Sequence, residues 1–279
     1  SVSSNVRHSV PFQYIGANLF VRTQIEWEVR IMGDFHQSGE ITTLHRFGSR
    51  DIAKLEAEIK KLSRLRPIAL VLPTIFTELK GAALPAILNE LKGVKYLKQI
   101  IVTLGRFNKE QFNYAKEFFS VLPQEVTLIW NDGPRVKKLY KLLDEKNVPA
   151  GSDGKGRSAW MAYGYILASE KSKVIVLHDC DVLTYSREFL ARLCYPVVNQ
   201  DLDFEFCKGY YSRVTDRMHG RVTRLLVTPL LRALSKLLGD LDFLKYMDSF
   251  RYPLAGEFSM VADLARGNRI PGDWGLGVG

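Results

Sequence analysis

The chain has 279 residues, of which 46% are hydrophobic and 25% are charged, and its formal net charge is +9. This is the composition of a globular protein, and the length allows one large domain or two small ones. No apolar run approaches the length of a membrane span, and no basic stretch followed by an apolar core opens the sequence, so neither a membrane span nor a secretory leader is expected. The positive charge is spread along the chain, which favours small anionic ligands over nucleic acid.

The chain has three cysteines, Cys180, Cys194 and Cys207. Their number is odd and no CxxC spacing occurs, so the pattern indicates neither a disulfide framework nor a zinc site. A reducing, cytoplasmic location is the default expectation for such a chain.

The hydrophobic patterns divide the chain into three parts. Residues 1–31 show no sustained period and are interpreted as an N-terminal extension. From residue 32 to residue 200, segments with helical spacing alternate with short, continuous apolar runs. The predicted helices cover residues 51–66, 83–97, 110–122, 134–147 and 157–170. The predicted strands cover residues 68–73, 99–105, 126–130 and 173–179. Apolar strands between helices indicate an α/β fold with a mostly parallel sheet covered on both faces.

The pattern changes after residue 200. Residues 204–214 are predicted to form a strand, residues 221–239 a helix rich in leucine, and residues 252–260 a short mixed stretch. Residues 201–279 are therefore interpreted as a smaller mixed region that follows the sheet. The apolar helix "LLVTPLLRALSKLL" is interpreted as a core helix or as a helix at a dimer interface, so a homodimer is one of the expected possibilities.

The stretch "VIVLHDCDVLTY" (174–185) ends an apolar strand with Asp179 and Asp181. Ligands of open parallel sheets gather at the carboxyl ends of the strands, and alternate residues of an extended chain point the same way. The two carboxylates can therefore converge on a hard cation such as Mg²⁺ or Mn²⁺, which often shares its coordination with phosphates. The alternative is a polar turn that Asp179 caps. His178 is expected to point away from the pair and to be packed.

The stretch "GSDGKGRSAW" (151–160) places three glycines and Lys155 before a helix. Glycines allow the backbone to approach a ligand closely, and a helix start together with a lysine favours anions. Neither the GxxxxGK[ST] nor the GxGxxG spacing is present. The segment is thus a candidate for the other side of a diphosphate, and a flexible loop with a surface lysine is the alternative.

The stretch "HGRVTRLLVTP" (219–229) opens a helix with Gly220, Arg221 and Thr223. Backbone N–H groups, a guanidinium and a hydroxyl together suit a phosphate or a carboxylate. Taken alone, the same residues are better explained by helix capping, with Arg221 in a surface ion pair.

The motifs "LVLPTIFTEL", "GKG", "HDCD", "FCKGYYSRV", "GRVTRL", "PLAGEF" and "DWGL" occur in this order. Over roughly residues 33–279 the chain thereby resembles the glucosyl-3-phosphoglycerate synthases, to which mannosylglycerate-type synthases are related. The resemblance implies the GT-A fold and a metal-dependent, retaining glycosyltransferase of compatible-solute synthesis. It implies a UDP- or GDP-hexose donor, with glucose as the expected hexose, and 3-phosphoglycerate or glycerate as the acceptor.

The resemblance also implies roles for individual residues. Donor binding falls to Pro73, Thr74, Glu78, Lys155 and Asp179, and metal binding to Asp179 and Asp181. Acceptor binding falls to Gly220, Arg221, Val222 and Thr223, and catalysis to Asp181, Lys155 and Glu257. Gly256 and Glu257 match the loop beside the sugar. Phe76 and Thr77 replace polar residues of the family's first motif, which leaves the base preference open.

Three other functions remain open. An inverting glycosyltransferase of the same fold would act on a polysaccharide or lipid acceptor. A nucleotide-sugar-binding paralogue would be catalytically impaired. A nucleotidyltransferase also uses paired acidic residues, but its glycine-rich loop is expected after the first strand, where "PTIFTEL" has no glycine.

The C-terminal motif "GDWGLGVG" departs from the family pattern. The family usually carries a carboxylate two residues after the position of Gly275, where this chain has Gly277, and a metal-binding histidine further on. The expectation from this departure is a chain that binds the nucleotide sugar but transfers the sugar slowly or not at all.

Overall fold

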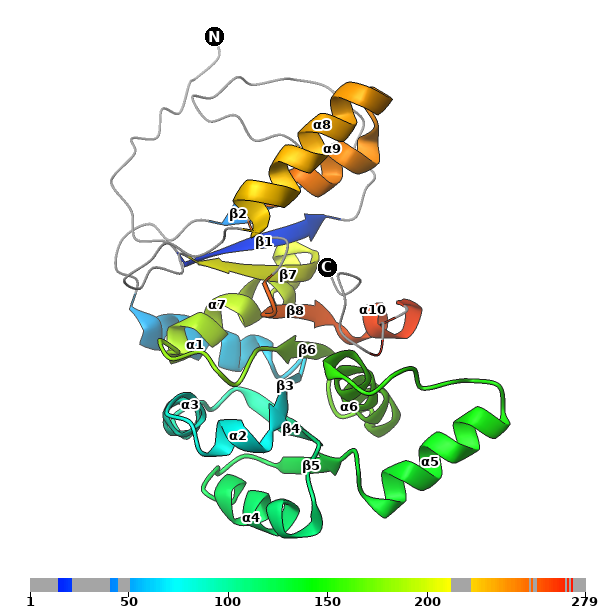
Figure 1. The fold of residues 1–279 in the computed structure, drawn as a ribbon. Coiled ribbons are helices and arrows are strands. Elements are labelled where there is room, and N and C mark those ends of the chain that lie inside the picture. The colour runs from blue at the N-terminus through cyan, green and yellow to red at the C-terminus, as the bar shows by residue number, and fades with distance from the viewer. Residues whose placement is uncertain are drawn as a thin grey trace.

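The structure is a computed structural model that describes residues 15–21, 41–44, 51–211, 222–250, 252, 255–268, 270 and 272. In these residues an eight-stranded sheet has helices on both of its faces (Figure 1). The strands are β1 (Ile15–Val21), β2 (Thr42–Leu44), β3 (Ile68–Ile75), β4 (Leu97–Gly105), β5 (Val126–Trp130), β6 (Val174–Leu177), β7 (Phe204–Tyr211) and β8 (Phe258–Val261).

The helices connect the strands. The α-helices are α1 (Ile52–Leu62), α2 (Phe76–Leu79), α3 (Ala83–Leu91), α4 (Lys109–Phe119), α5 (Pro134–Glu145), α6 (Lys155–Ser169), α7 (Arg187–Val198), α8 (Thr228–Leu238), α9 (Asp242–Ser249) and α10 (Ala262–Gly267). A 3₁₀-helix, η1 (Gln200–Leu202), precedes β7, and a π-helix, η2 (Thr223–Val227), leads into α8. None of the helices in the described ranges has the length and apolar composition needed to cross a bilayer.

The strand order is β2-β1-β7-β8-β6-β3-β4-β5. The pairs β3·β4, β3·β6 and β4·β5 are parallel, and the remaining neighbours are antiparallel. Because β8 is antiparallel to both of its neighbours and β1 to both of its own, the other six strands all run in one direction. The predicted α/β fold with a mostly parallel sheet is therefore confirmed, with two reversed strands inserted in one half.

Local sequence signals begin several of these elements. The side chain of Asp51 accepts a hydrogen bond from the Ala53 N–H at 3.0 Å and caps α1. Asn108 and Gln111 form a reciprocal capping box at the start of α4. Pro134 occupies the first position of α5, where a missing N–H costs nothing. The five helices and four strands predicted between residues 51 and 179 all form.

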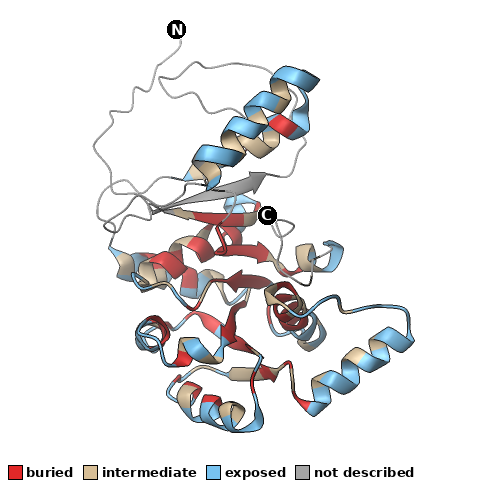
Figure 2. Ribbon diagram, in the orientation of Figure 1, coloured by how far each residue is buried: buried red, intermediate tan, exposed pale blue. Residues whose placement is uncertain are grey.

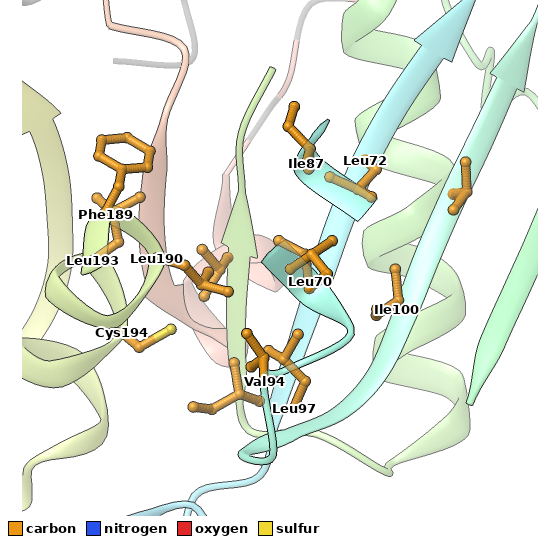
Figure 3. Packing of buried hydrophobic residues seen from close by; sticks show 14 of the residues in the cluster. Leu70, Leu72, Ile87, Val94, Leu97, Ile100, Phe189, Leu190, Leu193 and Cys194 are labelled. Atoms are coloured by element: carbon orange, nitrogen blue, oxygen red, sulfur yellow. The ribbon is translucent and has the colours of Figure 1, made fainter. Parts of the chain in front are cut away.

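Side-chain alternation along the strands builds one core on each face of the sheet. On β3, Leu70 and Leu72 point to the face covered by α1, α3 and α7, where they pack in what we call the α7-side core (Figure 3). Ala69 and Val71 point to the opposite face and pack in the α6-side core. Figure 2 shows the buried residues concentrated in the central strands and in the helix faces that cover them. Such burial on both faces explains why these strands are apolar throughout.

Two segments differ from the sequence prediction. Residues 1–31 were expected to lie outside the fold, but Ile15–Val21 forms β1, which pairs with β7 and β2. Pairing gives partners to backbone groups at the edge of β7 that would otherwise be open. The strand and the mixed stretch predicted after residue 200 form β7 and β8, which extend the same sheet beyond β6.

Candidate functional site

The carboxyl ends of β3, β4 and β6 surround a cavity of about 280 Å³. Parallel strands bring their carboxyl ends to one edge of a sheet, which is where ligands of such sheets bind. The cavity is lined by Pro73, Thr74, Ile75, Glu78, Gly105, Arg106, Asp153, Gly154, Lys155, Ser158, Asp179, Cys180 and Asp181. All the residues that the sequence assigned to the donor and the metal are therefore brought together around one space.

Two of the residues that line this cavity form an ion pair. The amine of Lys155, the first residue of α6, contacts Oδ1 of Asp179, which follows β6. Their side chains are 29% and 24% exposed, so both groups are partly sheltered yet accessible to a ligand. The N-terminal end of a helix carries partial positive charge, which adds to the charge of Lys155. The edge formed by α6 is thus suited to an anion.

Glu78, on the short helix α2, also lines the cavity. Its carboxylate accepts a hydrogen bond from the Ile75 N–H at 2.8 Å, which fixes its orientation. Burial raises the pKa of Glu78, and the charges of Asp181 and Asp179 raise it further, while the Ile75 N–H and Lys155 oppose the shift. The negative charges of Asp179 and Asp181 therefore act on Glu78, and a cation held by the two aspartates would offset this repulsion.

The aspartate pair has the chemistry of a magnesium or manganese site. Carboxylate oxygens are hard donors, and Asp179 is partly buried whereas Asp181 is exposed. The described ranges hold no group of three or more His, Cys, Asp or Glu side chains that could enclose a metal ion. Two carboxylates with open positions are the arrangement in which Mg²⁺ is shared with a substrate's phosphates. The residues fit the cation that the sequence predicts.

Gly256 shapes the space around Asp179. A Cβ atom at this position would lie 2.7 Å from Oδ2 and 2.9 Å from Oδ1 of Asp179. Contacts this short essentially never occur, so any side chain here would displace the carboxylate. The segment that the family resemblance placed beside the sugar therefore lies directly against Asp179.

The two residues that flank Asp179 face the protein interior. His178 is fully buried, its ring packs against Tyr185 at 4.9 Å, and the Tyr185 hydroxyl lies 3.2 Å from Nε2. Burial lowers the pKa of His178 to about 4, so the ring is neutral. The prediction that His178 is packed is confirmed. Cys180 is 1% exposed and its sulfur lies 3.2 Å from Oγ1 of Thr74, and burial raises the pKa of its thiol.

The structure describes two of the four predicted acceptor residues, Val222 and Thr223. Gly220 and Arg221 lie outside the described residues, as does Gly277. Val222 is 54% exposed, and Thr223 begins the π-helix η2. Oγ1 of Thr223 is sheltered from solvent and has no hydrogen-bond partner in the described parts of the chain. A ligand hydroxyl or oxyanion could satisfy this oxygen.

Arg106 is a cavity residue that the sequence prediction missed. It follows β4 with a φ of 61°, an uncommon conformation for a residue other than glycine. Its guanidinium lies 3.5 Å from Asp153, which also pairs with Arg157 at 2.5 Å. Because Arg106 comes directly after a predicted parallel strand, its strand-end position was the available signal.

Lys208 is the second residue that the prediction missed. It lies on β7, is 2% exposed, and pairs in register with Phe258, the first residue of β8, which follows the fully buried Glu257. A lysine within the apolar stretch "FEFCKGYY" was the signal, because a charged residue in a central strand needs a partner.

Curated proteins similar to the chain carry one name. The glucosyl-3-phosphoglycerate synthase of Persephonella marina (strain DSM 14350 / EX-H1) is 50% identical over 247 residues, which are 88% of this chain and 61% of that protein. The glucosyl-3-phosphoglycerate synthase of Methanococcoides burtonii (strain DSM 6242 / NBRC 107633 / OCM 468 / ACE-M) is 40% identical over 250 residues, again 88% of the chain and 61% of the relative. The chain thus spans less than two thirds of the length of these relatives. No protein-family model matches it.

Solved structures show the same architecture. Glucosyl-3-phosphoglycerate synthase from Mycobacterium tuberculosis, in complex with Mn²⁺, uridine diphosphate and glucosyl-3-phosphoglycerate, aligns with a TM-score of 0.51 at 21% identity, over 79% of this chain and 64% of that one. Two further structures of that protein hold Mg²⁺ with uridine diphosphate, and Mn²⁺ with UDP-glucose and phosphoglyceric acid. Each has a TM-score of 0.50 at 22% identity over 79% of this chain and 63% of that one. The GT-A fold is confirmed.

Proposed function

The chain is a homologue of the glucosyl-3-phosphoglycerate synthases, and we propose that it transfers glucose from a nucleotide sugar to 3-phosphoglycerate. The names of the two curated relatives supply the sugar and the acceptor, and free glycerate is the competing acceptor. UDP-glucose is the proposed donor, because it is bound in a structure of the same fold.

One observation carries this proposal. Glu78, Lys155, Asp179 and Asp181 come from three separate segments of the chain and line a single cavity at the carboxyl ends of the parallel strands. A polar turn at Asp179 or a surface loop at Lys155 would not require the two groups to meet. Their ion pair therefore favours a binding site over these simpler explanations.

In the proposed donor site, each of these residues binds a different part of the nucleotide sugar. Lys155 and the N-terminus of α6 bind the diphosphate, and Asp179 and Asp181 are the residues that would hold Mg²⁺ or Mn²⁺. Glu78, fixed by the Ile75 N–H, accepts a hydrogen bond from a hydroxyl group of the nucleoside. Lys155 must then exchange its contact with Asp179 for a phosphate oxygen, so donor binding replaces the ion pair with two charge-matched contacts.

The same residues account for the chemistry of transfer. A bound divalent cation supplies positive charge that offsets the charge developing on the departing diphosphate. Lys155 stabilises that charge from the other side with a preorganised ammonium group. The acceptor hydroxyl forms a bond to the anomeric carbon on the face from which the diphosphate leaves. Its proton passes to a phosphate oxygen of the leaving group, so the configuration is retained and no covalent nucleophile is required.

The acceptor is proposed to bind beside Glu257 and the start of η2. Thr223 offers a sheltered hydroxyl, and Arg221 supplies the guanidinium for a phosphate or carboxylate. A three-carbon acceptor with anionic groups matches a site that combines the guanidinium cation of Arg221 with the neutral hydroxyl of Thr223. A polysaccharide or lipid acceptor would not require this anion-binding pair of residues.

A substrate panel tests the proposal. The chain is incubated with Mg²⁺, with UDP-glucose, GDP-glucose or UDP-mannose, and with 3-phosphoglycerate or glycerate, and glycosylated products are detected by mass spectrometry. We expect product from UDP-glucose and 3-phosphoglycerate, and none from the Lys155→Ala variant. The departure at Gly277 leads the sequence to predict the other outcome, which is binding of the donor with little or no transfer. That result with both acceptors would support a catalytically impaired paralogue and contradict the proposed transfer.

A further inference from the structure

Ser158 and Asn131 form a buried polar pair beside the proposed donor cavity. Ser158 lies on α6, three residues after Lys155, and it lines the cavity although it is only 7% exposed. Asn131 follows β5 directly and is 3% exposed. Its Nδ2 atom donates a hydrogen bond to Oγ of Ser158 at 2.7 Å. The sequence prediction assigned a role to neither residue.

The bond from Asn131 leaves the proton of the Ser158 hydroxyl unused. A serine oxygen can accept hydrogen bonds and has one proton to donate. Because Asn131 is the donor in this pair, the Ser158 oxygen is the acceptor, and its own O–H must be directed elsewhere. Serines inside helices often donate to a carbonyl one turn back, but the described residues provide no acceptor for the Ser158 proton. The hydroxyl is therefore available to a ligand in the cavity.

The position of the pair along the sheet edge assigns it to the base of the nucleotide. The parallel strands follow one another in the order β6, β3, β4 and β5. In the proposed donor site the diphosphate lies beside Asp179, after β6, and a nucleoside hydroxyl lies beside Glu78, after β3.

Ser158 lies further along this edge, at the ends of β4 and β5. A Cβ atom at Gly105, the last residue of β4, would lie 3.7 Å from Oγ of Ser158, and Asn131 follows β5. The segment before β8, which is proposed to face the sugar, lies on the other side, against Asp179. The base is therefore the part of the donor that reaches Ser158.

We propose that Ser158 selects the base of the donor: its hydroxyl, oriented by Asn131, donates a hydrogen bond to a carbonyl oxygen of that base. Uracil and guanine have such an oxygen and adenine does not, and a site built for a hydrogen bond rejects the ligand that cannot form it. The inference rests on the proposed function and adds the base recognition that the first motif left open. Asn131 is a positioning residue, because it acts through Ser158.

Calorimetry with UDP, ADP and pyrophosphate, each in the presence of Mn²⁺, separates the base from the diphosphate. The unaltered chain should bind UDP more tightly than ADP. Ser158→Ala should weaken UDP binding by about three- to tenfold, the scale of one neutral hydrogen bond. It should weaken ADP binding less, and it should leave pyrophosphate binding unchanged because that ligand has no base.

Ser169→Ala is the matched control for Ser158→Ala. It makes the same substitution at the far end of the same helix, where the Ser169 hydroxyl donates to the Ile166 carbonyl at 3.0 Å. None of the three affinities should change in this variant.

Asn131→Leu tests whether Asn131 orients the hydroxyl. Oδ1 of Asn131 is buried and has no hydrogen-bond partner in the described ranges, so a leucine of similar size gives up only the side-chain bond to Ser158. UDP binding should weaken, but less than in Ser158→Ala, because the released hydroxyl still reaches the base. Pyrophosphate binding should stay unchanged. The double variant Ser158→Ala/Asn131→Leu should bind UDP no more weakly than Ser158→Ala alone.

The inference fails by itself when the unaltered chain binds UDP and pyrophosphate but the variants behave differently. Undiminished UDP binding by Ser158→Ala would overturn it. Equal losses for UDP and pyrophosphate would place the hydroxyl at the diphosphate, and equal losses for UDP and ADP would place it at the ribose. Additive losses in the double variant would overturn the role of Asn131. An unaltered chain that binds neither UDP nor pyrophosphate would overturn the proposed function itself.

Discussion

Replacing Gly256 by alanine is a sharp test of the site, because the geometry sets the size of the effect. The new methyl group would lie 2.7 Å from Oδ2 of Asp179, whereas ordinary contacts begin at 3.4 Å. The carboxylate must therefore retreat by the difference, 3.4 less 2.7, or about 0.7 Å. The backbone of Gly256 is not in the left-handed region, so alanine adds no strain of its own.

A shift of this size moves one of the two carboxylates that are proposed to hold the cation. Misplacement by 1 Å can cost about 10²-fold in an active site, so we expect Mn²⁺-dependent UDP binding to weaken by about tenfold, or about 1.4 kcal/mol. The assay is calorimetric titration of UDP in the presence of Mn²⁺.

Gly164→Ala is the matched control. Gly164 lies on α6 with nothing within 4 Å of the added atom, so UDP binding should not change. The substitution should add up to about 1 kcal/mol of stability, because alanine favours helices. If Gly256→Ala bound UDP and Mn²⁺ as tightly as the unaltered chain, Asp179 would not be a ligand in the way proposed.

Three further substitutions test separate parts of the account. Asp181→Ala should lower the Mn²⁺-dependent affinity for UDP by about tenfold or more in calorimetry, and undiminished binding would count against the metal assignment. Arg221→Ala should raise the KM for 3-phosphoglycerate by roughly 10- to 100-fold in steady-state kinetics, with little change for the donor. His178→Phe should reduce the acid sensitivity of folding in metal-free protein. The unfolded chain protonates His178 below about pH 6.5 and the folded chain only near pH 4, so stability falls as the pH drops between these values, by up to about 3 kcal/mol. Urea unfolding at pH 7 and pH 4.5 measures this slope, and an equal slope in the variant would contradict it.

The parallel half of the fold was predictable from sequence because its strands are buried on both faces. The strands predicted at 68–73 and 173–179 contain unbroken apolar runs, and they form β3 (Ile68–Ile75) and the shorter β6 (Val174–Leu177). The cavity followed from topology, since parallel strands bring distant residues such as Glu78 and Asp179 to one edge.

Elements that depend on tertiary packing were missed. Helix α7 contains Pro196, which local rules treat as a helix breaker, yet Pro196 and most of its neighbours are buried in the helix. Strand β1 owes its place to the edge of β7 rather than to a period of its own.

The sequence prediction missed Lys208 for the same reason, because the surroundings of this residue depend on tertiary packing. Its burial follows from the pairing of β7 with β8, which brings its amine over the ring of Phe258. The apolar stretch around the lysine signals that it is buried, but the strand pattern alone does not identify its neighbours in the fold.

The most direct test of the proposed transfer is an NMR time course of the chain with Mg²⁺, UDP-glucose and 3-phosphoglycerate. The account predicts that the anomeric signal of UDP-glucose is replaced by that of a glycoside with the same anomeric configuration, in step with the release of UDP. The variant Lys155→Ala should leave the starting signals unchanged. An inverted product, or donor that stays intact with the unaltered chain at saturating substrate, would contradict the account.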